Sequence, residues 1–285
     1  AEVPKEKTNE EVLLEAKRCQ EELHTWGRAN QVAFDAKKES FHVLSEKQPE
    51  GDNFKLLGVL YDCQLRMEAE VRKLASEAGW KLRTLLRTSN FHCDAQLVDV
   101  YKSRLLSYVE YRTAALYHAT DTVLKPLDDV QTRFLRALDC TELEALTVYN
   151  LVPLAARRDI AMLGVIHRTV LGKGPKHFQA FFKQKQQQKA RTTRLADRRH
   201  HKQLEDPRQG CFPELLRRSA LGLIAVYNLL PKELVEEKTV KGFQTELQAL
   251  LKKRAEAGHE NWSESFSPRM PLWKHPLAKC GFEKQ

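Results

Sequence analysis

The chain has 285 residues, 42% of them hydrophobic, and is long enough to bury the core of one large domain or two ordinary ones. Lysine and arginine number 47 against 38 aspartate and glutamate, so the formal charge is +9 and the pI is about 9.2. This balance favours polyanionic partners, nucleic acid among them.

Targeting and membrane segments are not expected. The first residues, Ala1 to Lys7, are polar and charged, which excludes a signal peptide. The longest apolar run, Ala220 to Tyr227, is far too short to span a bilayer. We therefore expect a soluble, intracellular protein without a membrane partner; the sequence does not distinguish nucleus from cytoplasm.

The cysteines do not form a metal motif. There are six, with no Cys-x-x-Cys pair, and we expect reduced, mostly buried thiols: Cys19, Cys63, Cys93, Cys140, Cys211 and Cys280. His200-His201 with Cys211, and His92-Cys93, lack partners at the spacing of a tetrahedral zinc site. Gly172-Lys173-Gly174 is too short for a phosphate loop and indicates a helix end.

A helix and then short strands are predicted at the start of the chain. Apolar residues recur every three or four positions from Glu10 to Ala29, which indicates an amphipathic helix. Ser40 to Ser45 and Phe54 to Tyr61 alternate like strands, and a polar loop with Pro49 and Gly51 separates them. The first sixty residues are therefore expected to form a helix followed by antiparallel strands.

Helices dominate the prediction for the rest of the chain. Thr141 and Glu144 have the spacing of a helix N-terminal capping box. Asp128 and Asp129 are expected in the first turn of a helix that follows Pro126, where acidic residues suit the helix dipole. Helical periodicity covers the segments 66–87, 97–117, 127–139, 155–171, 215–230 and 240–251.

A basic segment interrupts these helices. Residues 183–208 contain nine Lys or Arg against three Asp or Glu, a net charge of +6, and few apolar residues. The fold class is thus mainly α (α+β), with a small antiparallel sheet near the N-terminus and a large helical region after it. The expected segments are 1–63 (helix and strands), 64–182 (helical region), 183–212 (basic linker) and 213–285 (C-terminal helices and an irregular tail).

One ordered set of residues narrows the interpretation. Trp26, Asn30 and Phe34 follow one another at intervals of four, then come Lys37-Lys38, a predicted strand, and Phe54-Lys55-Leu56-Leu57-Gly58-Val59 with Asp62 after it. This order resembles the distal palm of non-LTR (LINE-type) retrotransposon reverse transcriptases. Later segments, such as 105–111, 127–136 and 154–158, resemble the helical thumb region that follows the palm in those enzymes.

The resemblance implies roles for particular residues. Lys38 or Lys37 takes the place of the lysine near the leaving pyrophosphate, and Leu57-Gly58 that of the hairpin that grips the primer end. Asp35 and Glu39 stand where the family usually has Asn and Thr. The residues expected to contact nucleic acid are Lys37, Lys38, Lys55, Gly58, Arg133, Arg136, Arg157, Arg158, Arg191, Arg194, Arg198 and Arg199.

The metal-binding motifs of the family are not in this sequence. Polymerisation needs two metal ions held by carboxylates, and in the family these residues precede the helix that here ends near Trp26. We expect no catalytic residue, metal ligand or cofactor in this chain; Mg²⁺ would belong to the missing palm motifs. Derivation from a reverse transcriptase is thus compatible with a chain that is inactive alone.

Two functions from different classes follow from these observations. The first is sequence-independent binding of RNA or DNA template-primer through phosphate contacts. The second is a non-catalytic helical protein-interaction module, from a domesticated or decaying element. The missing catalytic palm of a longer polypeptide is a further expected partner. In place of phosphate contacts, Arg157-Arg158 would pair with acidic residues such as Glu142 and Glu144. Basic residues that converge on one face favour the first function, and an exposed apolar patch favours the second.

Overall fold

The computed structural model describes residues 8–45, 47–185, 200–206 and 213–279. As predicted, the protein is mainly α-helical, and the described residues contain a single two-stranded antiparallel sheet near the N-terminus. The chain divides into two compact units, residues 1–70 and 71–285, which we call the N-terminal unit and the helical unit.

The N-terminal unit is one helix followed by short elements. Helix α1 (Asn9–Ala29) begins at a capping box, in which Thr8 accepts from the backbone of Glu11 while the Glu11 side chain accepts from Thr8, and it confirms the predicted helix. The elements after it are the 3₁₀ turn η1 (Ala36–Lys38) and the strands β1 (Phe54–Leu56) and β2 (Val59–Tyr61).

The hairpin differs from the predicted pair of strands. Residues 54–61 form both strands, and Leu57 (φ 50°) and Gly58 (φ 85°) make the turn between them. Two successive residues with positive φ are typical of a type I′ turn, which matches the twist of a two-stranded hairpin. The predicted strand over 40–45 was wrong, because that segment contributes only an isolated bridge between Val43 and Glu50.

The N-terminal unit buries little of its apolar surface. Its buried hydrophobic residues, among those described, are Val43, Val59, Cys63 and Met67. Large apolar side chains of α1 remain exposed, with Leu14 at 64% and Trp26 at 57% exposure, and Gly27 is the buried residue of that helix. The amphipathic stripe that the sequence indicates is therefore present, but most of it faces solvent.

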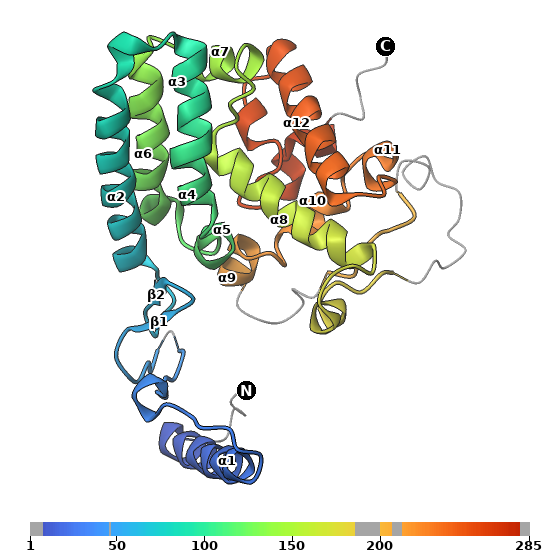
Figure 1. The fold of residues 1–285 in the computed structure, drawn as a ribbon. Coiled ribbons are helices and arrows are strands. Elements are labelled where there is room, and N and C mark those ends of the chain that lie inside the picture. The colour runs from blue at the N-terminus through green and yellow to red at the C-terminus, as the bar shows by residue number, and fades with distance from the viewer. Residues whose placement is uncertain (1–7, 46, 186–199, 207–212, 280–285) are drawn as a thin grey trace. The chain divides into compact units, whose positions relative to one another are not determined.

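The helical unit holds the remaining helices, most of which Figure 1 labels. The long helices α2, α3 with α4, and α6 stand side by side, and the chain runs up α2, down α3 and α4, and up α6. The elements are α2 (Glu68–Leu86), η2 (Ser89–Phe91), α3 (Asp94–Val100), η3 (Tyr101–Leu106), α4 (Ser107–Glu110), α5 (Thr113–Leu116), α6 (Asp121–Ala137), α7 (Glu142–Thr147), α8 (Leu154–Val170), η4 (Lys176–Ala180), α9 (Pro213–Arg218), α10 (Leu223–Tyr227), α11 (Lys232–Val235), α12 (Val240–Glu256), η5 (Trp262–Glu264), η6 (Leu272–Lys274) and α13 (Pro276–Lys279).

Helix α6 corrects two predictions. It begins at Asp121, where Thr120 accepts from the backbone N–H of Val123, and not after Pro126. Pro126 lies inside the helix, so Asp128 and Asp129 stand in its middle and not in its first turn. The capping box of Thr141 and Glu144 at α7 is confirmed, and the predicted helix 155–171 corresponds to α8 within one residue.

Two groups of buried side chains hold the helical unit together. Tyr101 of η3 stacks on Phe134 of α6, with ring centroids 4.1 Å apart, in the part built from α2, α3, α4 and α6. In the other part His167 of α8 stacks on Phe243 of α12 at 4.0 Å and shares a hydrogen bond with the Tyr227 hydroxyl. Both helix pairs are thus fixed by aromatic contacts as well as by aliphatic packing.

Part of the predicted basic linker belongs to this packing. Leu204 of the linker is buried in the same cluster as Tyr227, and so is Phe182, the residue directly before the linker. Gln184 pairs with Leu204 through an isolated antiparallel bridge, and Asn228 exchanges hydrogen bonds with the Leu204 backbone. Within the described ranges, no helix has the length and apolar character that crossing a membrane requires.

Candidate nucleic-acid interface

Three of the lysines predicted to contact nucleic acid lie around one groove of the N-terminal unit. Lys37 and Lys38 are exposed on η1 and Lys55 is exposed on β1. The groove has a volume of about 1280 Å³, and α1 forms one of its walls. Its other lining is largely apolar and includes Leu23, Phe34, Phe41, Phe54 and Leu56.

Local hydrogen bonds position η1 in that groove. Asp35 accepts from the Lys37 backbone N–H at 3.1 Å, and its other carboxylate oxygen lies 3.4 Å from Lys38 Nζ. Glu39 accepts from the His24 ring at 2.9 Å, which ties the segment after η1 to α1. Asp35 and Glu39, the two departures from the family pattern, thus have local roles in holding η1.

Gly58 lies at the tip of the hairpin and does not line this groove. A Cβ placed there would meet no atom within 4 Å, so the glycine is needed for its positive φ and not for room inside the unit. Its neighbour Leu57 is 82% exposed. The tip of the hairpin is therefore accessible to solvent.

A second groove lies between α2 and α6 of the helical unit, and it contains two of the predicted arginines. Arg133 and Arg136 of α6 line it together with Arg83 of α2, and its volume is about 640 Å³. We call it the arginine groove. Its other lining residues are Ala75, Ser76, Gly79, Pro126, Asp129 and Thr132.

The guanidinium groups of the arginine groove are not engaged in ion pairs with the described residues. Among the described residues, none of the carboxylates forms an ion pair with Arg83, Arg133 or Arg136. Arg133 Nε donates to the Asp129 backbone carbonyl at 3.2 Å, which leaves its two terminal nitrogens for a ligand. Each guanidinium presents planar donors that match phosphate oxygens.

Gly79 shapes the floor of the arginine groove. It is buried, and a Cβ placed on it would lie 3.5 Å from Nη2 and 3.7 Å from Nη1 of Arg133. The guanidinium of Arg133 therefore lies across the backbone of α2 where no side chain separates them. This arrangement places cations from two helices at one site.

Arg157 and Arg158 of α8 are engaged elsewhere. Arg157 pairs with Glu110 of α4, and Arg158 makes two hydrogen bonds to Asp128 of α6, at 2.6 and 2.8 Å. Arg158 is only 9% exposed, so its fork is taken by the carboxylate. The alternative pairing with Glu142 and Glu144 was wrong in its partners, because Glu144 accepts from Thr141 instead. These two arginines hold helices together and do not line the arginine groove.

The last four predicted arginines, Arg191, Arg194, Arg198 and Arg199, lie outside the described residues. The described residues that flank them, up to Lys185 and from His200, are joined by the bridge of Gln184 and Leu204. His200 is buried, and its Nε2 donates to the Tyr227 carbonyl at 2.9 Å, so a backbone oxygen occupies that ring nitrogen.

Sequence reasoning missed Arg83 and the other α2 residues of the arginine groove. Helical periodicity predicts the helix but not the element that packs against it, and only packing of α2 against α6 makes these residues one wall of a groove. The available signal was composition: Ser76, Trp80, Arg83 and Arg87 recur at intervals of three or four on one face. Such mixing of cations with an aromatic residue is typical of surfaces that bind nucleic acid.

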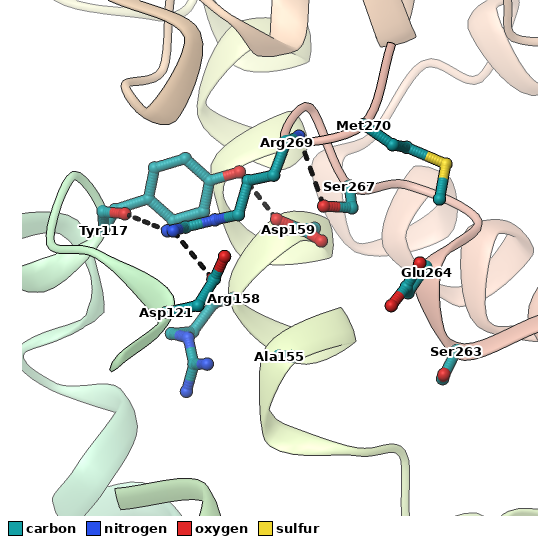
Figure 2. Close-up of a pocket in the computed structure, with 10 residues that line it drawn as sticks. All are labelled: Tyr117, Asp121, Ala155, Arg158, Asp159, Ser263, Glu264, Ser267, Arg269 and Met270. Carbon is teal, nitrogen blue, oxygen red and sulfur yellow. Dashed lines mark hydrogen bonds and ion pairs between the residues drawn. The ribbon is translucent and has the colours of Figure 1, made fainter. Parts of the chain in front are cut away.

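A second polar cavity in the helical unit is held by structural contacts (Figure 2). The Tyr117 hydroxyl donates to Asp159 at 2.6 Å, while Arg269 donates to the Tyr117 carbonyl at 2.9 Å and pairs with Asp121 at 2.8 Å. The cavity has a volume of about 270 Å³, and Arg158 also lines it. Burial raises the pKa of Asp159 to about 7, although the Tyr117 hydrogen bond and two arginines oppose this shift. These contacts tie the segment around Arg269 to α5, α6 and α8.

Comparison with known proteins gives no relative from which the role of these residues could be inferred. No family model matches this chain, and neither does any curated protein or solved structure that was searched. In the part of the chain that the structure describes, no three His, Cys, Asp or Glu side chains gather as a metal site would require. The reverse transcriptase resemblance and the absence of a cofactor therefore stay predictions.

Proposed function

We propose that this chain binds the phosphate backbone of RNA or DNA through the arginine groove, without reading base sequence. The observation that carries the proposal is the convergence of Arg83, Arg133 and Arg136 on one groove, with no ion pair among the described residues to neutralise them. Unpaired arginines crowded on one surface repel one another, and a polyanion removes that repulsion while releasing its own counterions.

The proposal agrees with the role that the sequence resemblance implies. In a reverse transcriptase the helical region after the palm holds template and primer, and the arginine groove belongs to the corresponding region here. The lysines of the N-terminal groove, Lys37, Lys38 and Lys55, would add contacts of the same kind. Catalysis would need the metal-binding palm motifs, which this sequence does not contain, so we propose binding without independent polymerisation.

The test is a binding titration with a matched charge control. Fluorescence anisotropy at low salt with a labelled 20-nucleotide RNA should show binding, and Arg133→Gln with Arg136→Gln should weaken it at least tenfold. The control double variant, Arg104→Gln with Lys253→Gln, removes two exposed charges outside the groove and should weaken it less than threefold. No binding by the parent chain at low salt, or equal loss in both double variants, would overturn the proposal.

A second candidate function rests on the N-terminal unit. Its exposed apolar side chains support docking of a protein partner such as the missing palm, since Leu23 and Trp26 are each 57% exposed and lie three residues apart on one face of α1. Sedimentation of the chain with and without an in-frame palm segment, if the upstream genomic sequence encodes one, tests this function. Loss of the complex in Leu23→Glu with Trp26→Glu, but not in Leu143→Glu of the helical unit, is the expected result.

A further inference from the structure

An exposed tryptophan stands beside the arginine groove. Trp80 lies in the middle of α2 and is 63% exposed, although tryptophan buries more apolar surface than any other residue type when it packs. Within the described ranges no aromatic ring or cation contacts it, unlike Trp273, which has Lys274 over its ring. The indole ring is therefore available to a ligand.

Helix geometry places this indole next to the groove cations. Ser76 and Arg83 both line the groove, and they are four residues before and three residues after Trp80. Residues at these intervals are neighbours on one helix face. Arg87, also exposed, lies directly beyond the end of α2, and its backbone N–H donates to the Arg83 carbonyl at 3.2 Å. The ring is thus bordered by Arg83 on its own helix at the edge of the groove, and Arg133 and Arg136 of α6 line the opposite wall.

The groove suits an extended strand. Its α2 wall runs from Ala75 to Arg83 and its α6 wall from Pro126 to Arg136. At the rise of an α-helix these walls are about 12 and 15 Å long, which corresponds to a few nucleotides of backbone. The two helices run in the same direction (Figure 1), so Arg83 and Arg136 stand near the same end of the groove.

We infer that the arginine groove and Trp80 together form a site for unpaired nucleotides, in which a nucleobase stacks on the indole while arginines hold the flanking phosphates. The inference rests on the proposed function and adds its substrate class. A base inside a duplex already stacks on both faces and offers no free surface to the ring, whereas every unpaired base offers one. Single-stranded nucleic acid and unpaired loops are therefore preferred over continuous duplex.

The test compares single-stranded with duplex binding. Oligo-dT with one 2-aminopurine is titrated at low salt against the full chain, alongside a duplex of the same length. Trp80→Leu should weaken single-strand binding about 5- to 150-fold and should abolish quenching of 2-aminopurine, while duplex binding changes less than twofold. Trp80→Phe should restore most of the affinity, because a phenyl ring also stacks.

The control is Trp273→Leu, which removes a tryptophan that is 73% exposed and lies outside the groove, and it should leave both affinities unchanged. Circular dichroism checks that the variants are folded. Unchanged single-strand affinity in Trp80→Leu, or equal loss for single strand and duplex, would overturn this inference while the phosphate proposal stands. Failure of the parent chain to bind either nucleic acid would overturn both.

Discussion

The two units of this chain differ in whether the apolar face of a helix is buried. Leu74 of the helical unit is fully buried, whereas Leu23, on the apolar stripe of α1 in the N-terminal unit, is 57% exposed. The helical unit surrounds its helices with partners, while α1 has few, and its stripe stays open. Amphipathic periodicity therefore shows which face of a helix is apolar, but not whether anything covers that face.

The arginines show the same contrast within the helical unit. Arg158 is buried and bonded to the Asp128 carboxylate of α6. Arg133, also on α6, lines the arginine groove and has no ion pair among the described residues. One arginine thus stabilises the fold and the other is left for a ligand. The predictions below separate these two uses, from the largest expected effect to the smallest.

The largest effect is expected from breaking the Arg158 ion pair. Arg158→Ala leaves Asp128 without its partner beside buried surface and should lower the free energy of unfolding by about 3–5 kcal/mol. Urea denaturation followed by circular dichroism measures the change. Arg133→Ala is the matched control on the neighbouring helix and should change stability by less than about 0.5 kcal/mol. Equal losses in the two variants would remove the distinction.

The two leucines test the contrast between the units. Leu74→Ala creates a cavity in a packed site and should lower the free energy of unfolding by about 2–5 kcal/mol. Leu23→Ala removes a mostly exposed side chain of the α1 stripe and should change it by less than about 0.5 kcal/mol. A large loss on changing Leu23 would show that the apolar stripe of α1 is covered.

The buried carboxyl in Figure 2 predicts a dependence of stability on pH. The pKa of Asp159 is about 7 in the folded chain against an ordinary value of 3.8, so the unfolded chain releases this proton first as pH rises. Its contribution to stability is full below pH 4 and declines as pH rises to about 7. Asp159→Asn, which carries no proton to lose, should gain about 4 kcal/mol relative to the parent between pH 4 and pH 8, because the two pKa values differ by about three units.

Buried His275 acts in the opposite sense, because burial lowers its pKa to about 4 and stability then falls as pH drops below 6.5. It is present in both proteins and cancels in the difference. A flat profile for Asp159→Asn would show that Asp159 is ionised in the folded chain.

Local signals in the sequence predicted much of the fold. The capping box of Thr141 and Glu144 involves neighbouring residues only, and the structure contains it. The strand predicted over 40–45 was wrong, because alternation alone does not supply a partner strand, while Leu57-Gly58 turns the next segment back on itself. The prediction that α6 begins after Pro126 was wrong, because Thr120 caps a helix that begins at Asp121 and Pro126 is accommodated within its first turns.

The candidate site was predictable only in part. Charge on α6 pointed to Arg133 and Arg136, but the same reasoning selected Arg157 and Arg158, whose partners lie 47 and 30 residues away in the chain. Arg83 was missed because its meeting with α6 depends on how two helices pack. Which arginines are neutralised is a tertiary property, and helical periodicity carries no information about it.

The salt dependence of binding tests the central claim most directly. The logarithm of the association constant for single-stranded RNA is measured against the logarithm of salt concentration for the parent chain and for Arg133→Gln with Arg136→Gln. Loss of two phosphate contacts should flatten the slope by about 1.4, and the control double variant, Arg104→Gln with Lys253→Gln, should keep the parent slope. An unchanged slope in the groove variant would show that these arginines do not contact phosphate and would contradict the account.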